Sequence, residues 1–326
     1  MARTIGIKAD TPSMVGRVLR DAGPYVAVAA VFMILHAVVN TYLQSMLTHI
    51  LLYGIFALSL NLLYGQSGMF SLGHAAYFGV GSYAVAILST RYGVGELFTY
   101  VGIGIVAGAL LALFLGLLAV RVTGVYFLLV TLAFGQLLYS LAVKWTGFTG
   151  GANGIPGIAF PRIAWAGSPV TSQAFFFVAL AFFLVVWVVL KRVTDSPFGQ
   201  ALSGIKRDEV RMRALGYNTW LFKYLSFAVA GAVAGLAGAL YAPFAGTVAP
   251  QHLGLTTSSL VMLMVIIGGR RFFLGPLIGA AIVLALQYLV SINMPQRWPL
   301  VLGAVFVVAV FVLTGDLGHL LRRLRR

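Results

Sequence analysis

Cysteine is absent from this chain of 326 residues, which excludes disulfides, thiolate metal sites and cysteine nucleophiles. Charge is also scarce, because charged residues make up only 9% of the chain and only seven residues are acidic. A soluble globular domain has roughly a quarter of its residues charged, so most of this chain's surface cannot face water. The five histidines are scattered and no acidic cluster accompanies them. The sequence therefore offers no catalytic or metal-binding constellation, and a membrane-bound enzyme is the least favoured class.

Long apolar runs take the place of the missing charge. Hydrophobic residues make up 60% of the chain, the mean hydropathy is +0.98, and about 20 apolar residues cross a bilayer as a helix. We therefore predict an all-α, polytopic integral membrane protein with about ten transmembrane helices. The range is eight to ten, because the eighth run is short enough to be a re-entrant segment. The predicted spans are 24–43, 46–64, 74–90, 98–119, 122–143, 172–191, 221–243, 257–268, 275–292 and 298–315.

The net charge of +15 would suggest nucleic acid in a soluble protein, but here the basic residues lie in loops between apolar runs. With both termini cytoplasmic, 18 of the 22 Lys and Arg residues fall on the inner side, as the positive-inside rule requires. We therefore predict an even number of spans, cytoplasmic N- and C-termini, and a multi-pass location in a bacterial-type inner (plasma) membrane. The first apolar run lacks a clear cleavage site and is interpreted as a retained helix rather than a signal peptide. Membrane lipid is an expected partner and nucleic acid is not.

One inner loop, residues 192–222, is the most charged part of the chain. Ser196 followed by Pro197 predicts a helix start, and a second short helix is predicted from Asp208 and Glu209 to a C-terminal Gly216. A basic linker is the plain alternative. However, an idle connection is usually a few residues long, whereas this loop carries one apolar helical face that needs a partner. That face consists of Phe198, Ala201, Leu202 and Ile205.

The segment DEVRMRALG within this loop resembles the EAA-type loop of ABC importer permeases, with Glu209, Ala214 and Gly216 at the matching positions. The longer segment SPFGQALSGIKRDEVRMRALGYN resembles branched-chain amino acid permeases of the LivH/LivM type, and LivM more closely. Three further segments are similar to the same family, namely those from Ala57 to Leu88, from Gly124 to Ile158 and from Ile266 to Ala280.

The resemblance implies a transmembrane permease subunit of an ABC importer for branched-chain or related small amino acids or amides. Loop 192–222, called the coupling loop from here on, would enter a cleft of an ATPase subunit through Glu209, Ala214, Leu215 and Gly216. The implied partners are a second homologous permease, two ATP-binding cassette subunits and a periplasmic or lipid-anchored binding protein. The chain has no Walker motif, so it is not expected to be an enzyme, and no cofactor or metal is expected in it. Its implied parts are a cytoplasmic segment 1–23, a transmembrane permease domain 24–315 and a basic cytoplasmic tail 316–326.

Polar residues at or near membrane depth are candidates for the substrate pathway, because unsatisfied polar groups are costly there. They are interleaved with glycines that permit close helix approach or a broken helix. Singly, each is better explained by a bond to a neighbouring helix, and His74 could be a packing residue or a helix cap. As a cluster, the polar residues from Asn61 to Tyr83 are better explained as lining the pathway. Relatives often carry an acidic and a basic residue where this chain has Gln136 and Tyr139. The candidates are Asn61, Gln66, Ser67, Ser71, His74, Tyr77, Thr131 and Gln136.

An ion-coupled secondary transporter of small polar solutes is the main alternative. Such proteins place ionisable residues within their spans, and none of the seven acidic residues lies mid-span here. The outer loop TGFTGGANGIPGI is a candidate docking surface for a binding protein, a gate, or a plain surface turn. Gly231, Gly235 and Gly238 are expected only to pack helices. Arg271, where relatives tend to have a small residue, could meet lipid phosphates or an ATPase subunit.

Overall fold

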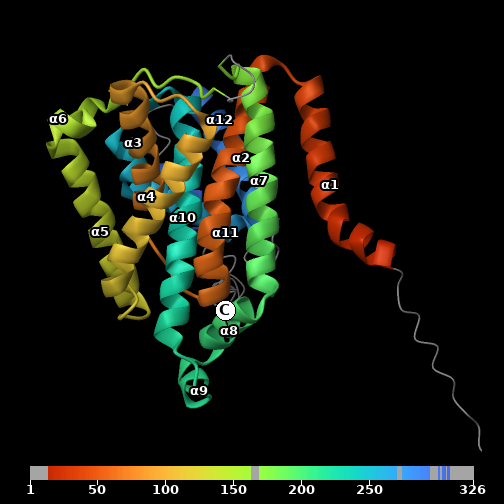
Figure 1. Ribbon diagram of the computed structural model, residues 1–326, viewed down its shortest axis with the longest axis vertical. Coiled ribbons are helices and arrows are strands. Elements are labelled where there is room, and N and C mark those ends of the chain that lie inside the picture. Colours follow the sequence, from red (N-terminus) through yellow and green to blue (C-terminus); the bar gives the residue numbers. More distant parts are fainter. Residues whose placement is uncertain are drawn as a thin grey trace, which may run out of the picture.

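The computed structural model describes residues 14–162, 169–269 and 274–293, and a few positions between 300 and 308. Long helices run side by side and form a bundle, with two short helices at one end and a glycine-rich loop at the other (Figure 1). The long elements are α1 (Met14–Val38), α2 (Thr41–Asn61), α3 (Ala75–Tyr92), α4 (Leu97–Ala119), α5 (Val125–Lys144), α7 (Ser172–Asp195), α10 (Thr219–Ala245), α11 (Leu255–Gly268) and α12 (Gly275–Asn293).

Short elements connect these helices. α2 continues into one π-helical turn, η1, and the remaining short helices and strands lie in the loops at the two ends. They are η1 (Leu62–Ser67), α6 (Thr146–Thr149), η2 (Gly151–Asn153), β1 (Ile155–Pro156), α8 (Pro197–Arg207), α9 (Glu209–Ala214), β2 (Thr247–Val248) and η3 (Pro250–Leu253).

An all-α membrane protein is confirmed, since six helices among the described residues are long and apolar enough to cross a membrane. The predicted spans 24–43, 74–90 and 257–268 fall on α1, α3 and α11, which lie outside those six. α11 has 14 residues, about 21 Å of helix, so the sequence correctly singled it out as short. The predicted span 298–315 lies mostly outside the described residues, as do Arg271 and segment 316–326. The count of about ten remains a prediction.

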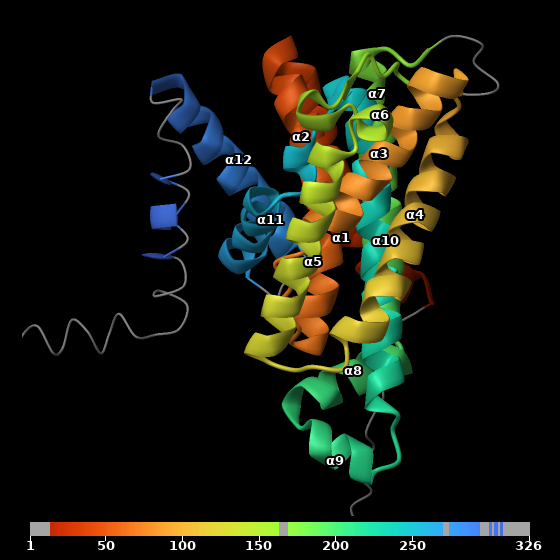
Figure 2. The ribbon, with the colours of Figure 1, turned by 90° about the vertical axis from the view of Figure 1, so that its left-hand side faces the viewer.

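α2 is the central helix of the bundle. Every residue from Ile50 to Leu63 is buried, and α2 packs against α7, α10, α11 and α12. A helix that is apolar all round belongs in the interior of a bundle, which explains why α2 has no polar face. α11 and α12 lie on one side of α2, and α4 lies on the other (Figure 2).

α4 and α10 pack closely along each other, because small residues line both surfaces. A Cβ on Gly108 would overlap the carbonyl oxygen of Gly231, and a Cβ on Gly235 would overlap that of Gly104. Gly238 lies in the same way against the carbonyl of Phe78. The glycine stripe of α10 therefore packs helices, as the sequence predicted.

The glycine-rich outer loop packs onto the end of α10. Ile155 and Pro156 pair antiparallel with Val248 and Thr247 in a two-stranded ribbon. Gly154 has φ +73° and lies against the Val248 carbonyl, so a side chain would be excluded there on both counts. This loop is thus a structured cap on the end of the bundle opposite α8 and α9 (Figure 1).

Candidate functional site

The coupling loop folds into two helices through local capping. The Ser196 hydroxyl accepts a hydrogen bond from the Gly199 amide (3.5 Å), with Pro197 in the first turn. The Asp208 carboxylate accepts one from the Arg211 amide (2.9 Å). Gly216 follows α9 with φ +88°, a left-handed conformation that favours glycine. Both helix starts and the glycine after the second helix are therefore confirmed.

α8 is anchored to the bundle by its apolar face and by polar bonds to η1. Ala201, Leu202 and Ile205 are buried. The Ser203 hydroxyl donates to the Gln66 side-chain oxygen (2.9 Å), and the Lys206 ammonium donates to the Gly65 carbonyl (2.5 Å). The loop is thus bound directly to the turn that ends the central helix, so a movement of α8 would be transmitted to α2.

Glu209 is turned toward its own chain. Its Oε2 accepts from the Lys223 ammonium (2.5 Å), and its Oε1 accepts from Arg213 (2.6 Å) and from the Thr219 hydroxyl (3.1 Å). Lys223, at the start of α10, is only 9% exposed and Glu209 is 23% exposed. These four residues, called the Glu209 cluster from here on, tie α9 to α10.

The electrostatics of this cluster favour the ionised carboxylate. Partial burial by itself raises the pKa of Glu209, but hydrogen bonds from Lys223, Arg213 and Thr219 and the positive charge of Lys223 outweigh it and hold the pKa below its ordinary value. The Glu209 carboxylate is therefore ionised at neutral pH.

The outer surface of α9 and of the turn after it is apolar and exposed. Val210 is 77% exposed, Leu215 is 67% exposed and Tyr217 is also exposed. Ala214 and Gly216 lie on the same exposed segment. α9 projects beyond the end of the bundle (Figure 2), which leaves these side chains accessible at the surface.

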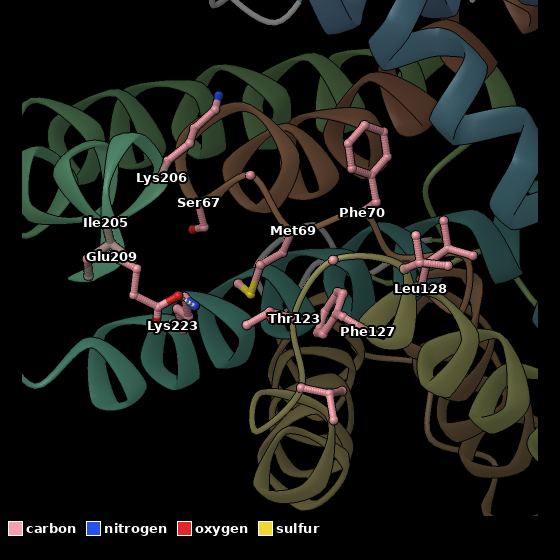
Figure 3. Close-up of a pocket in the computed structure, with 14 residues that line it drawn as sticks. Ser67, Met69, Phe70, Thr123, Phe127, Leu128, Ile205, Lys206, Glu209 and Lys223 are labelled. Carbon is pink, nitrogen blue, oxygen red and sulfur yellow. Dashed lines mark hydrogen bonds and ion pairs between the residues drawn. The ribbon is translucent and has the colours of Figure 1, made fainter. Parts of the chain in front are cut away.

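A cavity of about 560 Å³ lies between the coupling loop and the bundle. In Figure 3, Glu209 and Lys223 lie on one side, and Phe70, Phe127 and Leu128 lie on the other. The Ser67 hydroxyl and the Met69 side chain point into the space between them. Its walls come from η1 and the turn after it, the α4–α5 connection, α8, α9 and the start of α10.

Most of the candidate pathway residues fall into two groups, and Gln136 lies apart from both. Gln66 and Ser67 lie beside the coupling loop, where the Ser67 hydroxyl is 3.3 Å from that of Ser226. His74 and Tyr77 lie deeper, with their rings in contact, and Thr131 accepts a hydrogen bond from the amide of Leu72.

Several of these groups are buried without a partner. Among the residues that the structure describes, no hydrogen-bond partner is found for Asn61 Oδ1, Ser71 Oγ or His74 Nδ1, although His74 Nε2 is 2.8 Å from the Ser59 hydroxyl. Gln136 instead lies on an exposed face of α5. The role of these eight residues in a pathway stays a prediction.

Sequence reasoning missed part of the site. Arg213 could have been found, because it follows Glu209 by one helical turn. Lys223 and Thr219 could not, because the path of the chain from α9 into α10 brings them to Glu209. Met69 and Phe127 gave no signal, since an apolar residue that lines a cavity looks like any other in this chain.

The described residues form a polytopic helical bundle with a folded helical loop at one end, which is the architecture of a membrane protein with several spans. Residues 42–313 match the family described as branched-chain amino acid transport system / permease component. The chain belongs to this family.

The relatives carry the same description. The chain is 31% identical over 265 residues to the high-affinity branched-chain amino acid transport system permease protein LivM of Escherichia coli (strain K12), covering 74% of this chain and 61% of that protein. It is 25% identical over 278 residues to the probable branched-chain amino acid transport permease protein LivM of Methanocaldococcus jannaschii, covering 74% of this chain and 79% of that protein. The chain thus spans about three fifths of the E. coli relative. No solved structure shows significant similarity to this chain.

Proposed function

We propose that this chain is the transmembrane permease subunit of an ABC importer for branched-chain or related small amino acids or amides. Partner subunits hydrolyse the ATP, and the chain itself catalyses no reaction. The importer lies in the inner (plasma) membrane and contains a second homologous permease, two ATP-binding cassette subunits and an external binding protein. Both termini and the coupling loop face the cytoplasm, in a bundle of about ten spans.

The coupling loop is the observation that supports this proposal most strongly. α9 and the turn after it expose an apolar surface at Val210 and Leu215, while α8 is bonded to the end of the central helix. An exposed apolar patch at the end of a membrane bundle indicates a protein-binding surface. The bonds to η1 give a motion received there a direct route into the membrane.

The same contacts assign different roles to the residues of the coupling loop. Glu209 supports α9 from inside, whereas Val210, Leu215 and Tyr217 form the surface that enters the ATPase subunit. Glu209 then affects ATPase binding by holding α9 in place, because its carboxylate is already bonded to Lys223 and Arg213.

Co-purification of the ATPase subunits tests this surface. Leu215→Asp introduces a charge into an apolar contact, so we expect most of the ATPase to be lost from the purified complex. Tyr92→Asp is the matched control, since Tyr92 is an exposed aromatic residue at the opposite end of the bundle. Unchanged ATPase recovery with Leu215→Asp would contradict the proposed surface.

A further inference from the structure

We propose that the cavity beside the Glu209 cluster is a cytoplasmic binding site for a zwitterionic amino acid with an apolar side chain. This inference rests on the proposed function for the class of cargo. It adds a site on the trans side of the membrane, where the transported compound accumulates and can act on the coupling loop.

The two ends of the cavity complement the two parts of such a ligand. Glu209 and Lys223 offer one negative and one positive group at the same end. The other charged residue that lines the cavity, Lys206, donates its ammonium to the Gly65 carbonyl. Met69, Phe127 and Leu128 form an apolar wall for an aliphatic side chain. The volume of about 560 Å³ lies within the range of about 300–1,000 Å³ that is usual for small-molecule sites.

The charge arrangement selects a zwitterion over an ion. An α-carboxylate would accept from Lys223 while the α-ammonium donates to Glu209, so both members of the pair keep a partner. A ligand with only one charge makes only one of these two charge-assisted contacts. A ligand without a carboxylate would also separate the nearly buried Lys223 from Glu209 without replacing its counter-charge.

Glu209 can exchange Lys223 for the ligand and keep its other hydrogen bonds. Oε1 stays bonded to Arg213 and Thr219, while Oε2, which faces Lys223, receives the ligand's ammonium. The ligand therefore inserts into the direct link between α9 and α10. Cytoplasmic amino acid would thus loosen the coupling helix and slow further uptake.

The test measures binding to the complete importer in nanodiscs, without its binding protein, by isothermal titration calorimetry. The probes are L-leucine, 4-methylpentanoate (which lacks the ammonium) and 3-methylbutylamine (which lacks the carboxylate). We expect L-leucine to bind and both analogues to bind about ten-fold more weakly or worse, because each loses one charge-assisted contact.

A blocking variant locates the binding. Thr123 is exposed and lines the cavity, whereas Tyr126, three residues along, is exposed and does not line it. We expect Thr123→Trp to abolish leucine binding and Tyr126→Trp to leave it unchanged. Undetectable leucine binding to the unmodified complex, equal binding of the analogues, or full binding to Thr123→Trp would each overturn the site.

Uptake by the same complex, reconstituted into proteoliposomes, separates this inference from the proposed function. The site alone would be refuted if ATP-driven uptake needs the binding protein but leucine binding is absent or is not blocked by Thr123→Trp. Absence of ATP-driven uptake of any branched-chain amino acid would refute the proposed function itself.

Discussion

At the scale of single residues, Glu209 shows how resemblance and structure contribute differently. The resemblance predicted a position that matters for coupling, and the structure identifies the atoms that the carboxylate contacts. The caps at Ser196 and Asp208 could be predicted because they depend on three or four consecutive residues. Lys223 lies 14 residues from Glu209, and no local rule connects them.

The Glu209–Lys223 pair gives a prediction about stability. Glu209→Gln leaves the nearly buried Lys223 without its counter-charge, so we expect a loss of about 1–3 kcal/mol. Adding Lys223→Met to Glu209→Gln removes the stranded charge and should raise the unfolding temperature above that of the single variant. Thermal unfolding in detergent measures both, and a double variant less stable than Glu209→Gln would contradict the pairing.

The lowered pKa of Glu209 gives a pH dependence with a defined sign. A carboxylate whose pKa is lower in the folded state stabilises the protein at pH values above its unfolded pKa, and this contribution is lost as the pH falls through the folded pKa. The stability difference between the unmodified chain and Glu209→Gln should therefore be constant from neutral pH down to about 5 and shrink below about 4.3. If this stability difference already shrinks between pH 8 and pH 6, the pKa of Glu209 is not lowered by its neighbours.

At the scale of elements, the apolar runs predicted where helices lie but not how they pack. α2 was predicted at 46–64 and covers Thr41–Ser67 together with η1, so the apolar run located the helix but underestimated its length. Its central place could not be predicted, because helices that face lipid and helices that face other helices are both apolar. The short α11 could be recognised because its apolar run is brief.

The α4–α10 contact gives a prediction with an internal control. Gly108→Ala places a methyl group against the backbone of α10, where only a shift of the helix can make room. Overpacking of this kind costs about 1–3 kcal/mol, so we expect a lower unfolding temperature and less protein in the membrane.

Gly102 lies on the same helix with no neighbouring atom in the way. Gly102→Ala should therefore be neutral or slightly stabilising, since alanine favours a helix over glycine. Equal effects of the two substitutions would show that α4 and α10 do not pack as described.

At the scale of the whole molecule, the basic residues predict the orientation of the chain in the membrane. The structure places the two loops singled out in the sequence at opposite ends of the bundle. α9 lies at one end and the glycine-rich loop at the other. Only the coupling loop combined local caps, unusual length and a family motif, which is why it could be predicted in more detail than the pathway residues. The pathway residues depend on helix contacts that single-chain patterns do not encode.

Because the chain has no cysteine, single-cysteine variants can test the orientation without background labelling. Tyr92→Cys, at the end of α3 that the proposed topology places outside, should react with a membrane-impermeant maleimide in intact cells. Val210→Cys, in α9, should react only after the inner membrane is permeabilised. The reverse pattern would invert the proposed topology and remove α9 from the ATPase side.

Uptake of radiolabelled leucine into proteoliposomes tests the central claim most directly. The complete complex, with its binding protein and ATPase subunits, is compared with this chain alone under an imposed proton or sodium gradient. We predict uptake only by the complex and only with hydrolysable ATP. Gradient-driven uptake by this chain alone, without ATPase subunits, would contradict the account and favour a secondary transporter.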